Sequence, residues 1–220
     1  MNIIQTWKTT DIPDQYINLV QSVVDHNPKW KLMFFSDKDI IDFIETQMPE
    51  YKTTFFSLSN KIEQIDFFRY LAIYHYGGVY LDLDMLVECS LDELYDNPCV
   101  CKFPIEYENI QDNIITDQNY HNLIGNYAFY APAKHAFIKK IIDNIVNKRL
   151  SSEDVSKAQQ TNGDSALDVE IYCRTGPILV TQSYIDFANN QNIELLSTTP
   201  FSPERFGKYA KHYCMGSWRK

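Results

Sequence analysis

The sequence predicts an α/β fold with a mostly parallel central sheet flanked by helices, and three observations support this prediction. Segments with strand periodicity alternate with segments of helical periodicity through the first 90 residues. The chain has 220 residues, of which 45% are hydrophobic, and this is enough for one full core. A glycine pair leads into an apolar strand at residues 79–88. We therefore expect a single domain over residues 1–220.

The first part of the chain is expected to form two strand–helix units. Apolar residues recur at helical spacing from Tyr16 to Val24, and a proline follows that segment closely. Ser36 and Asp39 resemble the start of a second helix, since a serine often caps a helix N-terminus. The expected elements are a strand at 3–7, a helix at 16–24, a strand at 30–34 and a helix at 40–47.

The helix expected over residues 61–76 carries two charges within an apolar stripe. Asp66 and Arg69 are three residues apart, so they can touch on one face of the helix. The opposite face is aromatic, which predicts a helix that is buried nearly all round. The pair could be a structural ion pair, but we favour a functional one, because buried charges concentrate at functional sites. Gly77 is expected to end the helix in a left-handed cap.

The strand expected over residues 79–88 places two carboxylates on one face. Side chains alternate along a strand, so Asp82 and Asp84 share a face with Tyr80. Two like charges at this spacing repel each other unless a cation or a set of donors lies between them. The pattern therefore indicates a divalent metal. Carboxylate oxygens together with one imidazole, for which His212 is the candidate, suit Mn²⁺ or Mg²⁺.

The second half of the chain is expected to continue with strands, helices and two polar segments. Residues 106–124 are polar and lack periodicity, so we expect them to be mostly loop. Residues 151–168 are also polar, and we expect them to lack regular structure. The C-terminal tail, with its histidine, serine and tryptophan, is expected to fold back onto the body of the protein. The remaining expected elements are strands at 99–103, 126–130 and 193–196 and helices at 137–146 and 178–187.

Several classes of protein are disfavoured by composition. The formal net charge is -9, which argues against nucleic acid as a partner. The sequence lacks a dinucleotide fingerprint and a P-loop, so any diphosphate must be held in another way. The five cysteines have no zinc-ligand spacing and predict free thiols. Neither a signal peptide nor a transmembrane segment is recognisable, so we expect a cytoplasmic protein, unless the chain is a domain excised from a larger one.

Five segments together resemble the DXD-motif sugar-transferase family, which includes yeast initiating mannosyltransferases, bacterial and viral capsule glycosyltransferases and, more distantly, clostridial glucosylating toxins. The segments are Gln5-Thr6-Trp7, Asp66-Phe67-Phe68-Arg69-Tyr70, the run from Tyr76 to Asp84, Thr175-Gly176-Pro177, and His212 with Ser217-Trp218. The resemblance implies a Rossmann-like fold of the GT-A type. It also implies a hexosyltransferase that moves a sugar from a nucleotide-diphosphate sugar to a glycan or another hydroxyl acceptor with retention of configuration. A UDP-sugar is favoured as the donor, and a GDP-sugar is possible.

The resemblance also implies roles for individual residues. Trp7 would stack on the base, Asp66 and Arg69 would contact the sugar or ribose, and Asn126 would face the transferred sugar. The tail would close over the diphosphate. The expected catalytic residues are Arg69, Asp82, Asp84 and Asn126, the expected metal ligands are Asp82, Asp84 and His212, and the expected donor-binding residues are Gln5, Thr6, Trp7, Asp66, Arg69, Tyr80, Asp82, Leu83, Ser217 and Trp218.

Three alternatives stay open on sequence alone. The run from Tyr80 to Leu86 also resembles the nucleophile strand of haloacid-dehalogenase-type phosphatases, with residues 163–168 as their later acidic motif. A non-catalytic protein that binds carbohydrate or nucleotide sugars is the second alternative. An inverting transferase, which needs a carboxylate base on the acceptor side, is the third, and Asp164 or Asp168 could supply that base.

Overall fold

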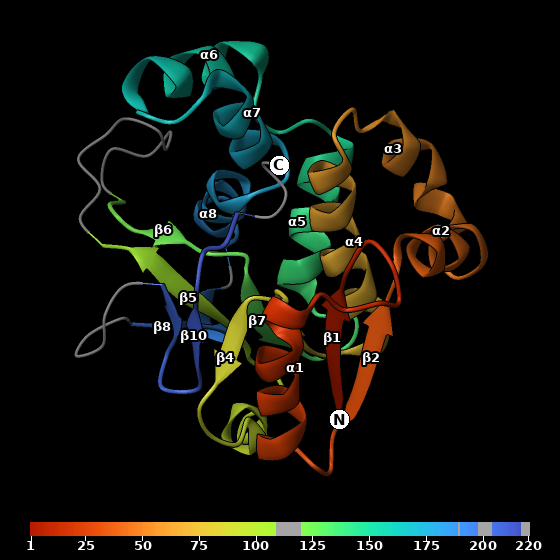
Figure 1. Ribbon diagram of the computed structural model, residues 1–220. Helices are drawn as coiled ribbons and strands as arrows, with labels where there is room; N and C mark the ends of the chain where they lie inside the picture. Colours follow the sequence, from red (N-terminus) through yellow and green to blue (C-terminus); the bar gives the residue numbers. More distant parts are fainter. Residues whose placement is uncertain (109–119, 189, 198–203, 217–220) are drawn as a thin grey trace.

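Figure 1 shows the computed structural model of the protein, which describes residues 1–108, 120–188, 190–197 and 204–216. A large mixed sheet lies at the centre, in the strand order β2-β1-β3-β7-β5-β6, with β8 beside β5. This arrangement, flanked by helices, confirms the predicted α/β class. The strands of the large sheet are β1 Asn2–Thr6, β2 Lys31–Phe35, β3 Gly78–Leu81, β5 Cys101–Tyr107, β6 Leu123–Ile124, β7 Ala128–Ala131 and β8 Ile193–Leu196.

Parallel and antiparallel pairs both occur in the large sheet. Strands β2, β1 and β3 are mutually parallel, as expected from the strand–helix alternation of the N-terminal part, and β8 runs parallel to β5. Strand β7 is antiparallel to both β3 and β5. A smaller antiparallel sheet, in the order β4-β10-β9, packs beside it. Its strands are β4 Met85–Val87, β9 Arg205–Phe206 and β10 Ala210–His212.

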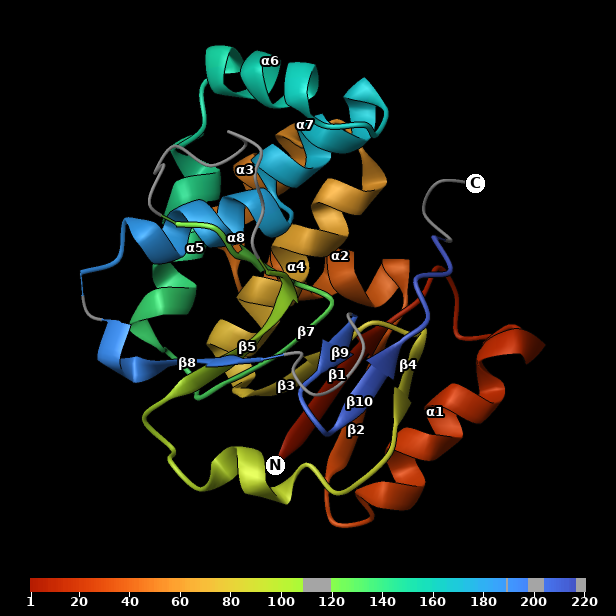
Figure 2. The ribbon, with the colours of Figure 1, turned by 90° about the vertical axis from the view of Figure 1, so that its left-hand side faces the viewer.

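Different layers cover the two faces of the large sheet, as Figures 1 and 2 show. The face that presents Ile4, Tyr80 and Phe129 packs against the larger group of helices, with α4 at its centre. The face that presents Ile3 and Val79 packs against the small sheet and α1. The helices are α1 Asp14–His26, α2 Asp37–Thr46, α3 Lys52–Ser57, α4 Lys61–Tyr76, α5 Ala136–Val146, α6 Ser152–Thr161, α7 Ala166–Arg174 and α8 Pro177–Ile185.

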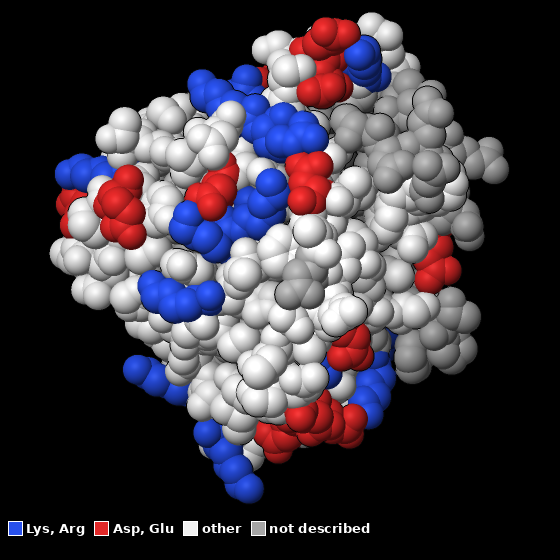
Figure 3. Space-filling view, turned by 180° about the vertical axis from the view of Figure 1, so that it is seen from behind, with Lys and Arg blue, Asp and Glu red and all other residues white. Residues whose placement is uncertain are grey.

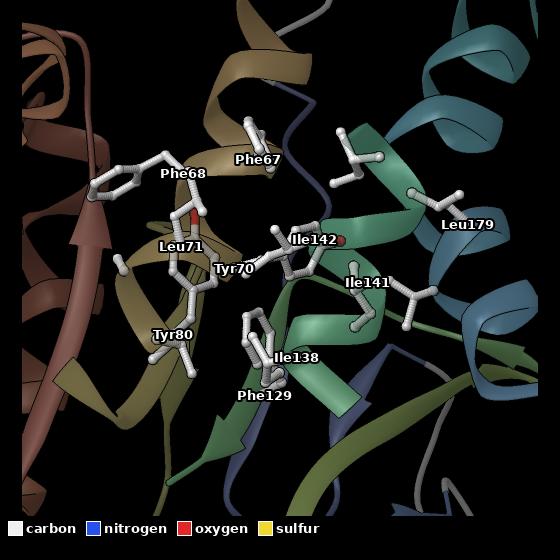
Figure 4. Close-up of a cluster of buried hydrophobic side chains, with 14 of the residues drawn as sticks. Phe67, Phe68, Tyr70, Leu71, Tyr80, Phe129, Ile138, Ile141, Ile142 and Leu179 are labelled. Atoms are coloured by element: carbon white, nitrogen blue, oxygen red, sulfur yellow. The ribbon is translucent and has the colours of Figure 1, made fainter. Parts of the chain in front are cut away.

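The main core forms where α4, α5 and α8 meet the sheet (Figure 4). The rings of Phe103 and Phe129 stack at 4.8 Å between centroids with an interplanar angle of 3°, which joins β5 to β7. Aromatic pairs in offset arrangements stabilise a core beyond their buried area. The labelled side chains in Figure 4 are Phe67, Phe68, Tyr70, Leu71, Tyr80, Phe129, Ile138, Ile141, Ile142 and Leu179.

Helix α4 is buried nearly all round, as its sequence predicted. Glu63, Asp66 and Arg69 are buried along with its aromatic residues. A capping box between Asn60 and Glu63 begins the helix, because each residue binds a backbone N–H of the other. Gly77 follows with a φ of 64°, the positive value expected for a glycine that ends a helix, although its ψ of 165° is extended rather than left-handed helical.

The prediction of one continuous strand over residues 79–88 was wrong. Strand β3 ends at Leu81, the chain turns through Asp82 to Asp84, and β4 continues in the other sheet. The Met85 N–H donates to the Asp82 carbonyl oxygen at 3.2 Å within this turn. The turn forms because aspartate favours turns and because β3 must leave one sheet to enter the other.

The prediction that residues 151–168 lack regular structure was also wrong. They form α6 and the start of α7, each begun by a serine cap, Ser151 with Asp154 and Ser165 with the Asp168 N–H. Helix α6 is polar and mostly exposed, so it lacks the apolar periodicity that marks a buried helix. Helix α3 was not expected either. Strand β5 extends to Tyr107, beyond the expected end at Phe103, and residues 109–119 of the expected loop lie outside the described residues.

Ion pairs at the surface add little to the stability that the core provides. On the face drawn in Figure 3, acidic and basic side chains are interspersed. Exposed pairs such as Lys52 with Glu45 at 2.8 Å contribute about 0 to 1 kcal/mol each. The five cysteines are free, as expected. None of the helices in the described part of the chain has both the length and the apolar character needed to cross a membrane.

Candidate functional site

The turn between the two sheets holds Asp82 and Asp84, and the C-terminal tail folds back onto it. Strand β10 pairs with β4 so that His212 lies opposite Met85. The Tyr213 N–H donates to the Asp84 carbonyl oxygen at 3.1 Å. This return of the tail was expected from its aromatic and histidine residues. It brings an imidazole from the end of the chain beside the two carboxylates.

Asp84 is held by the tail through both carboxylate oxygens. His212 Nε2 lies 3.2 Å from Asp84 Oδ1, and the Met215 N–H donates to Asp84 Oδ2 at 2.8 Å. Burial by itself would raise the pKa of the Asp84 carboxyl, but these donors and the charge of His212 lower it overall. Burial likewise opposes protonation of His212, yet the hydrogen bond to Asp84 raises its pKa to about 10.

The His212 ring is fixed in place by two further neighbours. It stacks on the Tyr127 ring with centroids 4.4 Å apart, and its Nδ1 lies 3.2 Å from the Cys214 sulfur. Tyr127 is buried and donates its hydroxyl hydrogen to the Arg205 carbonyl oxygen. The imidazole therefore presents Nε2 to the carboxylates in a defined orientation.

Asp82, Asp84 and His212 fit a divalent metal. One ligand atom from each residue lies within 4.8 Å of the other two. Burial raises the pKa of Asp82, and the nearby charge of Asp84 raises it further, so a cation between the two carboxylates would relieve their repulsion. Two carboxylates with one imidazole are a donor set that Mn²⁺ and Mg²⁺ accept.

Arg69 connects this cluster to helix α4. Its Nη2 lies 2.9 Å from Asp66 Oδ1 and 3.4 Å from Asp82 Oδ1, so the predicted contact between Asp66 and Arg69 is confirmed. The guanidinium group stands 4.5 Å above the centre of the Tyr80 ring, and the Tyr80 hydroxyl donates to Asp82 Oδ1 at 2.8 Å. One buried arginine thus balances two carboxylates, and its pKa is raised by those charges although burial opposes this.

Asn126 joins the same network from the segment between β6 and β7. Its side-chain nitrogen donates to Asp66 Oδ1 at 3.2 Å and to the Tyr70 hydroxyl at 3.1 Å. The backbone carbonyl oxygen of Asn126 accepts a hydrogen bond from Arg69 Nη1 at 2.7 Å. The Asn126 amide nitrogen therefore fixes the Asp66–Arg69 pair.

Two members of the network, Thr175 and Tyr70, were absent from the predicted site residues. The Thr175 hydroxyl donates to Asp66 Oδ2 at 2.8 Å, and the Tyr70 hydroxyl donates to the Thr175 carbonyl oxygen at 2.9 Å. Both residues stand in segments that carried the family resemblance, so the signal was present. Periodicity alone marks Tyr70 only as core.

The end of β1 also lies next to the turn that holds Asp82. The Gln5 amide nitrogen donates to the Asp82 carbonyl oxygen at 3.4 Å, and Gln5 Oε1 is buried without a partner among the described residues. The Thr6 hydroxyl lies 3.4 Å from the Tyr80 hydroxyl. Trp7 is half-buried against Tyr16, with ring centroids 5.0 Å apart, in an apolar cluster that also holds Leu83.

Two expected residues lie outside the described part of the chain, and the two candidate bases lie on the α6–α7 segment. Ser217 and Trp218 lie outside the described residues. Asp164 is exposed between α6 and α7, and Asp168 lies in the first turn of α7.

Comparisons with known proteins agree with the sequence motifs. Residues 13–101 match a family model described as the glycosyltransferase sugar-binding region containing the DXD motif. The resemblance to the DXD-motif sugar-transferases is therefore confirmed. Inositol phosphoceramide mannosyltransferase 3 of Schizosaccharomyces pombe is 38% identical over 96 residues, which cover 44% of this chain and 27% of that protein. The chain thus spans about a quarter of the length of this relative.

A longer but weaker match extends over nearly all of this chain. The initiation-specific alpha-1,6-mannosyltransferase of Candida albicans is 23% identical and covers 99% of this chain and 71% of its own length. Among solved structures, the ligand-free glycosyltransferase domain of the YGT toxin superposes with a TM-score of 0.55 and 9% identity, over 88% of this chain and 79% of that one. The fold is accordingly of the GT-A type, as the resemblance implied.

The comparisons also correct the expected location. The prediction of a cytoplasmic protein is contradicted by the curated relatives, which are yeast mannosyltransferases named for inositol phosphoceramide and for an initiation-specific reaction. That prediction relied on the lack of a recognisable anchor in the sequence, and an absence of this kind does not identify a compartment.

Proposed function

We propose that the protein is a metal-dependent glycosyltransferase that moves a hexose from a nucleotide-diphosphate sugar to a hydroxyl acceptor. The observation that carries this proposal is the cluster of Asp82, Asp84 and His212 beside the buried Arg69. The names of the relatives support a sugar transfer, and mannose is the first sugar to test. The donor is a UDP-sugar or a GDP-sugar, with UDP favoured from the resemblance.

In this proposal the turn between the sheets holds the metal. Asp82, Asp84 and His212 would be its ligands, and when bound it would act as a Lewis acid toward the diphosphate leaving group. The tail keeps Asp84 and His212 in register through the Met215 N–H and the stacking on Tyr127. These contacts pre-orient the ligands, so little reorganisation accompanies binding.

Arg69 would stabilise negative charge on the donor. Asp66, the Asn126 carbonyl oxygen and the Tyr80 ring hold its guanidinium group in one position. A fixed positive charge in a site of low dielectric constant stabilises charge that develops in a transition state more strongly than a mobile one. Asn126 would act through Asp66 and Arg69, and its expected contact with the transferred sugar stays a prediction.

The end of β1 would bind the nucleoside. Trp7 offers a half-exposed ring for stacking, and Leu83 lies in the same apolar cluster. The unpartnered Gln5 Oε1 is an acceptor that a bound donor could satisfy. Thr6 and Tyr80 support the position of Asp82 through their hydroxyl groups.

A calorimetric screen of UDP-hexoses and GDP-hexoses with Mn²⁺ tests the proposal. We expect one donor to bind in Mn²⁺ and to bind much more weakly in EDTA. Donor hydrolysis and transfer to methyl α-mannopyranoside are then measured with the donor that binds, and NMR of the product tests the proposed retention of configuration. Hydrolysis of a generic phosphate ester without binding of any nucleotide sugar would favour a phosphatase instead. Binding without hydrolysis or transfer to any acceptor would favour the non-catalytic alternative.

A further inference from the structure

Residues 213–215, the turn that follows β10, contact both Asp84 and His212. The Tyr213 N–H donates to the Asp84 carbonyl oxygen at 3.1 Å, and the Met215 N–H donates to Asp84 Oδ2 at 2.8 Å. Between these two residues, the Cys214 sulfur lies 3.2 Å from Nδ1 of His212. The turn therefore reaches two of the three candidate metal ligands, and Cys214 contributes a side-chain contact to one of them.

The backbone of Cys214 adopts a conformation that serves this arrangement. Its φ is 50°, a value that residues other than glycine seldom adopt. Such a conformation persists where the surrounding contacts require it. The side chain of Cys214 is exposed, so core packing does not impose the conformation. The contacts on either side of Cys214 are those with Asp84, and its own contact is with His212.

Stacking on Tyr127 fixes the plane of the His212 ring but not the edge that it presents. The two rings lie 4.4 Å apart between centroids, with an interplanar angle of 17°. A half-turn of the imidazole about its Cβ–Cγ bond would keep this stacking, and it would exchange Nε2 with a carbon. The contact of Nε2 with Asp84 at 3.2 Å favours the observed edge. A metal bound between these two groups would replace that contact, so a partner at Nδ1 is needed to keep the orientation.

The Cys214 sulfur is suited to be this partner. A neutral imidazole that binds a metal through Nε2 carries its hydrogen on Nδ1, and a cysteine sulfur is a weak acceptor for such a hydrogen. Metal-binding histidines almost always donate their other ring N–H to an outer partner, which fixes both the tautomer and the ring orientation. In this structure the group at that position is the thiol of Cys214.

We propose that Cys214 is a positioning residue, whose sulfur accepts the Nδ1 hydrogen of His212 and so holds Nε2 toward the metal. This inference rests on the proposed function, because the metal is part of that proposal. The sulfur is not itself proposed as a ligand, since it contacts the ring nitrogen on the other edge of the imidazole. The set of ligand atoms within 4.8 Å of one another consists of Asp82, Asp84 and His212.

The test compares the Mn²⁺ dissociation constants of wild type, Cys214→Ala, Cys214→Ser, Cys214→Gly and Cys99→Ala by calorimetric titration. Cys214→Ser keeps an acceptor for the Nδ1 hydrogen. Cys214→Gly tests the backbone, because glycine adopts a φ of 50° without strain. Cys99 is the matched control, since it is also an exposed free cysteine and lies just before β5.

A second measurement reports on His212 itself. Electron spin echo envelope modulation of bound Mn²⁺ detects the nitrogen of a coordinated imidazole. The protein has five histidines, so His212→Gln identifies the part of the signal that belongs to His212. Circular dichroism melting reports on folding in every variant. Loosened packing of the tail would lower the melting temperature, whereas loss of positioning reduces the nitrogen signal in a folded protein.

We expect Cys214→Ala and Cys214→Gly to bind Mn²⁺ at least about 10-fold more weakly than wild type, with a reduced His212 nitrogen signal. Cys214→Ser should stay closer to wild type, and Cys99→Ala should match it. Wild-type affinity and nitrogen signal in Cys214→Ala would overturn the inference and leave the proposed function intact. Equal losses in Cys214→Ser and Cys214→Ala would also overturn it, because an acceptor at this position would then make no difference.

Three further outcomes count against the inference. Wild-type binding in Cys214→Gly together with weak binding in Cys214→Ala would assign the effect to the backbone rather than to the sulfur. A wild-type protein that binds Mn²⁺ without a His212 nitrogen signal would show that His212 is not a ligand. A wild-type protein that binds neither Mn²⁺ nor any nucleotide sugar overturns the proposed function and the inference with it.

Discussion

Asp84 is the residue on which the tail and the turn converge, since His212 and the Met215 N–H contact its two oxygens. We predict that Asp84→Asn weakens Mn²⁺ binding by at least about 10-fold, because an amide oxygen carries no charge and a neutral ligand no longer orients His212. Calorimetric titration with Mn²⁺ measures the effect. Asp25→Asn, on the exposed end of α1, is the matched control and should bind Mn²⁺ like wild type. Equal affinities of Asp84→Asn and wild type would remove Asp84 from the ligands.

Asp66 gives the stability of the protein a predictable pH dependence. Burial raises the pKa of Asp66 to about 6, although Arg69 and the hydroxyl of Thr175 oppose the shift. The native state therefore holds this proton more tightly than the unfolded chain. The contribution of Asp66 to stability is full below about pH 4, the unfolded value, and is lost as pH rises through 6.

We expect the free energy of unfolding of wild type minus that of Asp66→Asn to fall between pH 4 and 6, with a slope of up to about 1.4 kcal/mol per pH unit. Urea unfolding at several pH values measures this difference. The comparison uses the slope rather than the absolute stability, because Asp66→Asn also removes the ion pair with Arg69. A difference that stays flat over this range would mean that Asp66 titrates normally.

At the scale of elements, the connection from α4 to β3 depends on a glycine. Gly78 has a φ of 122°, and a Cβ at this position would lie 2.2 Å from the Asn2 carbonyl oxygen of the adjacent β1. We predict that Gly78→Ala destabilises the protein by about 2 to 5 kcal/mol through backbone strain and overpacking. Urea unfolding measures the loss.

Gly163 supplies the matched control for this substitution. A Cβ there would meet nothing within 4 Å. Gly163→Ala should therefore change stability by less than about 0.5 kcal/mol. Equal effects of the two substitutions would show that the close approach of β3 to β1 does not limit the fold.

The sequence located most elements of the fold because their apolar periodicity was strong. Helices α1, α2, α4, α5 and α8 and strands β1, β2, β3 and β8 all lie where apolar spacing predicted them. The break after Leu81 was missed, since apolar alternation continues through Val87 whether the strand stays in one sheet or passes to another. Helix α6 was missed because its exposed residues carry capping signals without an apolar stripe.

The candidate site was partly predictable for a similar reason. Asp66 and Arg69 stood out as charges inside an apolar stripe, and the structure places them in contact. The two aspartates of the turn stood out by spacing, although a turn rather than a strand face brings them together. Spacing and periodicity did not mark Thr175, because its hydrogen bond to Asp66 joins residues that are 109 positions apart in the sequence. Long-range pairing of this kind leaves no local signal in the sequence.

At the scale of the whole molecule, the candidate site lies where the two sheets meet. Asp82 follows a strand of the large sheet, His212 ends a strand of the small one, and Arg69 reaches in from the helical layer. A ligand that contacts all three would tie these layers together. Binding to such a site should therefore stabilise the whole fold cooperatively rather than one segment of it.

We predict that Mn²⁺ together with the donor selected in the calorimetric screen, at about 100 times its dissociation constant, raises the free energy of unfolding by about 2.7 kcal/mol. For a chain of 220 residues this corresponds to a rise in Tm of about 5 to 11 °C. Thermal melts followed by circular dichroism measure it, and Asp84→Asn should show little of the shift at the same concentrations. Because the carboxylates of the turn would contact the donor through the metal, the shift should nearly disappear in EDTA. An equal shift in EDTA would mean that the donor binds without a metal, and the roles of Asp82, Asp84 and His212 would then be limited to packing the tail against the turn.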